Sequence, residues 1–118
     1  MSYLDRLLKQ DATRWELTGF SEYGDPTFNT PQFLSPDDQQ GVRWENKSEL
    51  FIDTKTGDQS HSRAIVWSAV TEFAVGDYLY LGESSAANPE SVSGADRVRY
   101  VEKVPDTKGR NFLYKAVL

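Results

Sequence analysis

The sequence predicts an all-β protein, built as a small β-barrel or sandwich of about seven strands with a long central hairpin and a short N-terminal helix. Apolar and polar side chains alternate over several segments, and this period of two is typical of strands with one face in water. Turn residues recur between these segments. Aromatic residues make up 13% of the chain, which favours a sheet protein over a helical one.

The composition bounds the class of protein further. A chain of 118 residues without internal repeat or linker predicts a single domain, residues 1–118, with one modest core. The net charge of −5 disfavours a free nucleic-acid binder, and the absence of cysteine excludes disulfides and thiolate metal sites. Because we see neither the apolar core of a signal peptide nor a membrane-length apolar run, we expect a cytoplasmic location, or one in an assembly built there, without membrane contact.

The first elements are a helix and a strand. Residues 2–10 predict a short helix with three leucines on one face. A helix of this length must dock, either on its own barrel or on a neighbouring subunit. Residues 12–18 alternate as a strand, which we expect Gly19 to end.

Residues 20–33 carry two prolines and a glycine and predict a turn-rich excursion without a regular element. Its aromatic side chains either fold back over the core or contact a partner. These side chains are Phe20, Tyr23, Phe28 and Phe33. Residues 32–35 predict a short strand, followed by a polar turn over residues 37–40.

The centre of the chain, residues 41–70, predicts a long β-hairpin. In its first strand, apolar residues share one face: Val42, Trp44, Leu50 and Ile52. Its second strand, residues 64–70, carries Ile65, Trp67 and Ala69 on one face. Gly57 can take the positive φ that the turn between them needs, and we expect a mobile, solvated tip. We expect Trp44 and Trp67 to be buried, so that alanine at either costs about 3–5 kcal/mol.

The remaining chain predicts a turn, a loop and three strands. Residues 75–77 form a turn before a strand over residues 78–82, and residues 83–95 form a flexible surface loop. Residues 97–104 and 111–118 alternate as the last two strands. On the first of these, Arg97, Arg99 and Lys103 share a face, which is either a solvated face or a place of nucleic-acid contact.

Candidate catalytic groups have simpler explanations. The carboxylates of Glu45, Glu49 and Asp53 share a strand face with basic residues, which indicates a solvated face and not a glycosidase pair. His61 is the single histidine and lies in a polar loop, so zinc and a catalytic triad are disfavoured. Residues 53–58 lack the calcium spacing of an EF-hand. We therefore expect no enzyme activity, no metal and no cofactor.

The order of the segments carries a resemblance. A strand with Trp15 leads to YGDPTF, then a long strand ending in ELFID, a TGD turn, RAIVWSAV, VGDYL and a final LYKAVL. In this order the chain resembles the small head-tail joining proteins of long-tailed bacteriophages, of the head-closure or stopper type. The resemblance covers residues 15–118.

The resemblance implies a virion structural protein, assembled in the host cytoplasm and located at the head-tail interface. Such β-barrels form a cyclic homo-oligomeric ring, six- or twelve-fold, that seals the DNA exit channel below the portal or adaptor protein. The ring also offers the attachment surface to the tail-terminator or tail-completion protein, and touches packaged DNA transiently and non-specifically. By position, it implies a channel-gating loop made of Asp53, Thr54, Lys55, Thr56, Gly57, Asp58, Gln59, Ser60, His61 and Ser62.

Two other classes stay open at this point. The chain is alternatively a tail-terminator or tail-completion protein, or an OB-like binding module of another assembly such as a baseplate or secretion system. A binding module predicts salt-dependent affinity for single-stranded DNA. An enzyme predicts a deep pocket lined with carboxylates of perturbed pKa.

Overall fold

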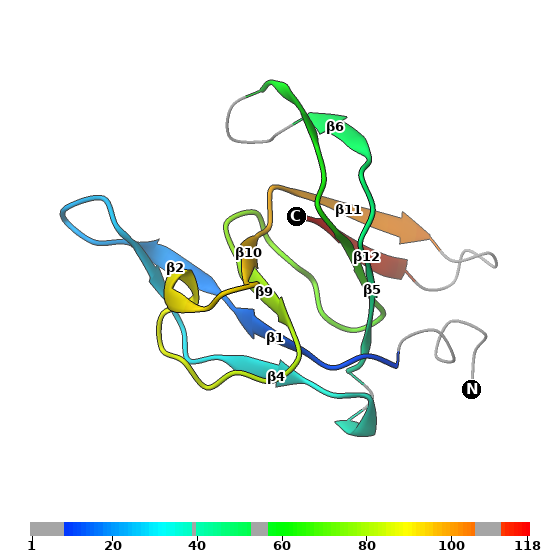
Figure 1. Ribbon diagram of the computed structural model, residues 1–118, viewed down its shortest axis with the longest axis horizontal. Coiled ribbons are helices and arrows are strands. Elements are labelled where there is room, and N and C mark those ends of the chain that lie inside the picture. Colours follow the sequence, from blue (N-terminus) through cyan, green and yellow to red (C-terminus); the bar gives the residue numbers. More distant parts are fainter. Residues whose placement is uncertain (1–8, 39, 53–56, 106–111) are drawn as a thin grey trace.

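The computed structural model describes residues 9–38, 40–52, 57–105 and 112–118. Strands dominate this part of the chain and the only helical elements in it are single 3-10 turns, so the predicted all-β class is confirmed. Two four-stranded antiparallel sheets and two two-stranded hairpins make up the fold (Figure 1). The described strands do not close into a barrel.

The first sheet has the strand order β10-β9-β1-β4. Its strands are β1 (Ala12–Trp15), β4 (Gln32–Leu34), β9 (Tyr78–Leu81) and β10 (Asp96–Arg97). In β1, Ala12, Thr13 and Trp15 are all buried, which fits a strand paired on both sides. The predicted turn before β9 is confirmed, and within it Gly76 takes a φ of +98°, which glycine adopts without strain.

The second sheet has the order β11-β12-β8-β5. Its strands are β5 (Val42–Glu45), β8 (Ile65–Ser68), β11 (Tyr100–Pro105) and β12 (Phe112–Val117). β5 and β8 are the inner halves of the predicted central hairpin, with Val42 opposite Ser68 and Glu45 opposite Ile65. The predicted closing strand is β12, which pairs with both β11 and β8.

A small apolar core joins the two sheets. Its buried members are Ala12, Leu34, Val42, Ala64, Val66, Phe73, Leu79, Val98, Ala116 and Leu118. At one corner, Gln10 and Val42 exchange two backbone hydrogen bonds of 2.9 Å, and so tie the chain before β1 to β5. At the other corner, the Val98 N–H donates to the Asp77 backbone carbonyl, just before β9 of the first sheet. The Arg99 N–H donates to the Val117 carbonyl, in the second sheet, so the chain passes from one sheet to the other here.

Two hairpins and two 3-10 turns complete the described chain. The elements are β2 (Leu17–Phe20) with β3 (Pro26–Phe28), β6 (Leu50–Ile52) with β7 (Gln59–His61), η2 (Pro36–Asp38) and η3 (Pro89–Ser91). The two hairpins project from the body at different sides, β2 at the left of Figure 1 and β6 at its top.

The structure corrects the strand predicted over residues 12–18. β1 ends at Trp15, and Gly19 lies inside β2 and does not end a strand. The break has a tertiary cause: the Leu17 N–H donates to the carboxylate of Asp77 at 3.0 Å and not to a neighbouring strand. A partner 60 positions away decides where this strand stops.

The turn-rich excursion predicted over residues 20–33 is wrong in part, because β2 and β3 form an antiparallel hairpin, whose register shifts between Leu17 and Gly19. The Thr18 hydroxyl donates to the Thr27 carbonyl at 3.0 Å across it. Pro26 is tolerated at the start of β3, since a proline at a strand end need not donate to the ladder. The aromatic residues divide: Phe28 packs edge-on against Tyr78, with ring centroids 5.3 Å apart, while others stay in solvent.

The surface loop predicted over residues 83–95 packs over the core. The Trp15 indole N–H donates to the Ala86 carbonyl at 2.8 Å, and the Ser84 N–H donates to the Thr13 hydroxyl at 3.0 Å. Pro89 is buried. The loop therefore covers the first sheet and is not a free excursion.

Two further expectations concern the extent of a predicted strand and of a predicted helix. The strand predicted over residues 97–104 is interrupted at residues 98–99, because Val98 turns the corner between the sheets. The predicted helix over residues 2–10 lies largely outside the described residues. Its last residue, Gln10, forms a β-bridge with Val42.

Candidate functional site

The most prominent feature near the predicted gating loop is the β6–β7 hairpin, which we call the arm (residues 50–52 and 59–61). Its register pairs Leu50 with His61 and Ile52 with Gln59. The arm continues the β5–β8 ladder outward and projects from the body (Figure 1). Gly57 has a φ of +76°, as the predicted turn requires.

The structure corrects part of the predicted loop over residues 53–62, because residues 59–61 form a strand. Asp53, Thr54, Lys55 and Thr56 lie outside the described residues. Gly57 and Asp58 precede β7, whereas Gln59, Ser60 and His61 belong to that strand, and Ser62 is buried. The C-terminal part of the predicted loop is therefore a strand followed by a buried serine. Residues 59–61 are polar and show no apolar alternation, so the sequence did not reveal the strand. They form it because they pair with residues 50–52.

Ser62 fixes the base of the arm. Its hydroxyl donates to the Lys47 carbonyl at 2.5 Å and accepts from the Glu49 N–H at 2.8 Å. Between the β5–β8 pairing and the β6–β7 pairing, these side-chain hydrogen bonds take the place of backbone hydrogen bonds between the two strands. The single strand predicted from Val42 to Ile52 is therefore split into two.

Arg99 joins the arm to the second sheet. Its guanidinium donates to the Ser60 hydroxyl at 2.9 Å, to the His61 carbonyl at 2.8 Å and to the Leu118 carbonyl at 2.7 Å. The same group lies 4.8 Å from the ring centroid of Phe51. Planar, multidentate binding of this kind suits arginine and not lysine.

We expect Arg99→Ala to loosen the arm without unfolding the protein. The change removes three hydrogen bonds from a charged donor, which are worth about 1.5–3 kcal/mol each in comparable sites. Because Arg99 is only half-buried, we expect amide exchange in β6 and β7 to rise by about tenfold. Hydrogen exchange by mass spectrometry measures it. Arg63→Ala is the control, and equal exchange in both variants would contradict the role of Arg99.

The charged face of the hairpin is paired. Arg43 lies 3.1 Å from Glu45, and Lys47 lies 3.8 Å from Glu49. Lys115 reaches Glu49 at 3.2 Å from the neighbouring strand. These ion pairs support the interpretation of the carboxylates as a solvated strand face. Among the described residues, no group of three or more histidine, cysteine or acidic side chains is placed to hold a metal ion.

His61, the single histidine, is exposed on β7 rather than in a loop. Its Nδ1 lies 3.4 Å from the Ser48 hydroxyl. Both side chains of this pair are exposed. His61 does not line either of the two larger pockets described below.

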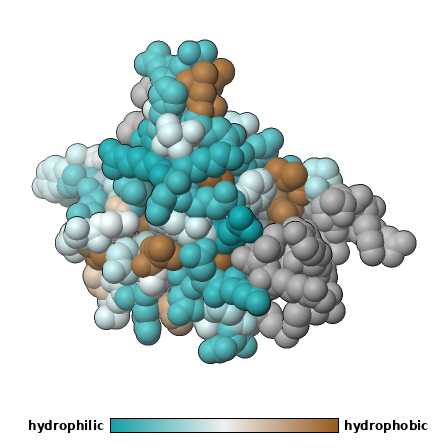
Figure 2. All heavy atoms as spheres, turned by 45° about the vertical axis from the view of Figure 1, so that its right-hand side comes forward, coloured by the Kyte–Doolittle hydropathy of each residue, from teal (hydrophilic) through white to brown (hydrophobic). Residues whose placement is uncertain are grey.

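An apolar groove of about 350 Å³ runs under the arm. Its lining residues are Leu50, Phe51, Ile52, Tyr100 and Val117, with Glu49, Glu102 and Lys115 at the rim. Leu50 and Ile52 remain 55% and 59% exposed, although the sequence places them on the core face. Brown apolar atoms accordingly appear among hydrophilic ones at the top of Figure 2, where the arm projects.

A second pocket, of about 390 Å³, is polar, and we call it the arginine pocket. It is lined by Arg63, Tyr78, Glu90, Ala95, Asp96, Arg97, Arg99 and Leu118. The sequence predicts Arg97, Arg99 and Lys103 on one strand face. The structure keeps the two arginines together but places Lys103 in another pocket, because the strand is interrupted at residues 98–99. Arg63 joins from a different hairpin, and no sequence pattern signals this.

The arginine pocket also holds a neutral hydroxyl. Burial raises the pKa of Tyr78 above the 10.0 of a free tyrosine, and the carboxylates of Glu90 and Asp96 add to the rise, while Arg97 opposes it. Tyr78 therefore stays protonated at neutral pH and is able to donate a hydrogen bond into the pocket.

In comparisons with known proteins, no family model, no curated protein and no solved structure matches the chain. In the described residues, no helix is both long and apolar enough to span a bilayer.

Proposed function

We propose that this protein is a structural ring subunit of the head-tail connector of a long-tailed bacteriophage, of the head-closure type. The single observation that carries the proposal is the projecting arm, a two-stranded hairpin with open edges that presents Leu50 and Ile52 to solvent. It extends from the position where the resemblance implies a channel gate. The all-β fold supports the same class of protein.

The arm suits contact with a neighbouring subunit. A two-stranded hairpin leaves unpaired backbone groups along its outer edges, and such edges are templates for pairing with another chain. Exposed aliphatic side chains on the same hairpin add apolar area to bury. In the proposed ring, the arms point toward the lumen and narrow the DNA channel.

The charge of the chain suits the same role. A net charge of −5 repels phosphate, so DNA passes the ring without adhering to it. In this proposal the subunits assemble under the portal or adaptor protein and present the tail-terminator or tail-completion protein with its attachment surface. The mature location is the virion.

Shortening the arm tests the gate. We expect that replacing residues 53–58 by Asn-Gly leaves the protein folded, because Ile52 and Gln59 are register partners and a two-residue turn joins such a pair. The variant is expected to bind tail-less, DNA-filled heads with the stoichiometry of the original protein, and to retain less DNA. Nuclease-accessible DNA, measured after incubation with the heads, gives the readout.

A variant with the same residues 53–58 in scrambled order, but with Gly57 kept, is the matched control. It preserves the length and is expected to retain DNA normally. Full retention by the shortened variant would show that the tip is not the gate. If the unmodified protein does not bind heads, the head-closure proposal itself is wrong, and binding to isolated tails would then favour the tail-terminator alternative.

The arginine pocket favours a second candidate, a binding module for single-stranded nucleic acid. Three arginines and an aromatic ring line it, but two carboxylates lie among them. Such a module predicts an affinity for single-stranded DNA that falls steeply with salt. A fluorescence titration with an oligonucleotide distinguishes the two candidates.

A further inference from the structure

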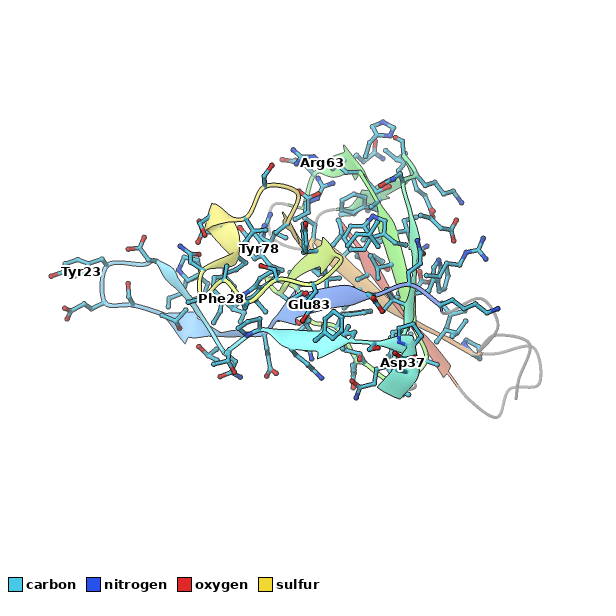
Figure 3. The ribbon with its side chains drawn as sticks, turned by 60° about the horizontal axis from the view of Figure 1, so that its bottom comes forward. Tyr23, Phe28, Asp37, Arg63, Tyr78 and Glu83 are labelled. Atoms are coloured by element: carbon cyan, nitrogen blue, oxygen red, sulfur yellow. The ribbon has the colours of Figure 1, made fainter. Side chains whose placement is uncertain are left out.

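The second projecting hairpin, β2–β3, carries the most exposed aromatic side chains of the described chain. Phe20 is 67% exposed and Tyr23 is 85% exposed. In Figure 3, Tyr23 lies at the far end of this hairpin, away from the body. Large aromatic side chains in such positions are typical anchors of protein interfaces.

The tip of this hairpin is a defined structure. The Ser21 N–H donates to the Asp25 carbonyl at 2.7 Å, and the Gly24 N–H donates to the Ser21 carbonyl at 2.9 Å. The Ser21 hydroxyl accepts from the Tyr23 and Asp25 N–H groups at 3.3 Å and 3.1 Å. Because the loop is ordered by its own bonds, presenting Tyr23 to a partner costs little conformational entropy.

The tip is acidic as well as aromatic. Glu22 and Asp25 flank Tyr23 and are exposed. Neither carboxylate forms a hydrogen bond or an ion pair with the described residues. A partner for this tip therefore needs cations around a space that admits a ring.

The arginine pocket has this chemistry. The Arg97 guanidinium forms no hydrogen bond or ion pair within the described part of the chain. Arg63 is 77% exposed at its side chain and uses one nitrogen to bind Asp96 at 3.1 Å. Arginine faces stack on aromatic rings and its fork binds carboxylates, so these two groups fit both parts of the tip.

The tip and the pocket of one molecule do not meet. In Figure 3, Tyr23 lies at one end of the molecule, while Arg63 and Tyr78 lie toward its middle. We propose that the β2–β3 tip of one copy inserts into the arginine pocket of a second copy, with Tyr23 against the arginines and Glu22 and Asp25 paired with Arg63 and Arg97. The Arg97 guanidinium and the carboxylates of Glu22 and Asp25, which form no ion pair among the described residues, then pair with each other.

This contact joins two different surfaces, so it is head-to-tail and repeats from copy to copy. A repeating head-to-tail contact closes into a ring when its rotation allows. The inference deepens the proposed ring function and rests on it for its biological meaning. It assigns the pairing that forms the ring to β2–β3, and leaves to the arm the contacts between neighbouring arms at the channel.

A charge-swap experiment on the full chain tests the contact. One variant, Glu22→Lys with Asp25→Lys, has a basic tip; the other, Arg63→Glu with Arg97→Glu, has an acidic pocket. In each variant alone, tip and pocket carry the same sign, so we expect neither to self-associate. Their mixture pairs opposite charges at every contact, and we expect it to assemble. Sedimentation velocity measures all three samples, and circular dichroism confirms that both variants fold.

Two further variants sharpen the test. Tyr23→Ala removes the ring and is expected to weaken the self-association of the unmodified chain by about 30-fold, as for an interface anchor. Asp37→Lys changes an exposed charge outside both surfaces and is expected to leave association unchanged.

Three outcomes would overturn the proposal: self-association of either swapped variant at the original strength, no complex in their mixture, or a monomeric unmodified chain. Binding of single-stranded DNA that requires Arg97, without association of copies, would overturn it in favour of a nucleic-acid ligand. Head binding and DNA retention are measured separately. The ring function can thus survive if this contact fails.

Discussion

Replacing Asp77 by alanine is expected to lower the free energy of unfolding by about 3–5 kcal/mol, because it leaves Arg14, whose side chain is only 12% exposed, without its partner. Asp77 is fully buried. Its Oδ2 accepts from Arg14 Nε at 3.1 Å, from Arg14 Nη2 at 2.9 Å and from the Ala74 N–H at 3.0 Å, while its Oδ1 accepts from the Leu17 N–H at 3.0 Å. Urea unfolding followed by tryptophan fluorescence measures the loss.

Asp96→Ala is the matched control for this prediction. Asp96 also pairs with an arginine, Arg63 at 3.1 Å, but that arginine is 77% exposed, so we expect a cost below about 1 kcal/mol. Asp77→Asn keeps the size of the side chain and one acceptor, and is expected to fall between the two. Equal costs for Asp77→Ala and Asp96→Ala would show that the buried site does not organise the fold.

Asp77 also shows why the sequence predicts some boundaries and not others. The turn at Val75, Gly76 and Asp77 follows from local residue types and is confirmed. The role of the Asp77 carboxylate cannot be predicted from local residue types, because its partners Arg14 and Leu17 lie 63 and 60 positions away. Strands that end through local turns were predictable, whereas strands split by a distant side chain were not.

The central hairpin gives the same lesson for the candidate site. Alternation predicts its pairing, and the turn residues predict the positive φ of Gly57. It does not predict that Leu50 and Ile52 face solvent, because the Ser62 hydroxyl interrupts the strand and the arm leaves the core. The arginine pocket was equally hidden, as it forms only when Arg63 approaches the β9–β10 pair.

Replacing Trp15 by alanine is the second large expected effect, about 3–5 kcal/mol of unfolding free energy. Trp15 is the largest fully buried side chain among the described residues. The sequence assigns this cost to Trp44 and Trp67. The structure corrects that expectation, because both side chains are only half-buried: Trp44 packs against the core from its edge, and Trp67 lies under the Lys115 ammonium at 5.4 Å. We expect Trp44→Ala to cost clearly less than Trp15→Ala.

Trp15→Phe separates the two contributions of the indole. Phenylalanine keeps most of the buried area but leaves the Ala86 carbonyl without its 2.8 Å donor. We expect a cost of about 1–3 kcal/mol, the penalty for an unsatisfied, partly buried acceptor plus a small cavity. Hydrogen exchange over residues 83–95 is expected to rise in the same variant, since this bond holds the loop over β1. Unchanged exchange there would mean that Ser84 and Pro89 hold the loop by themselves, and that Trp15 contributes through packing alone.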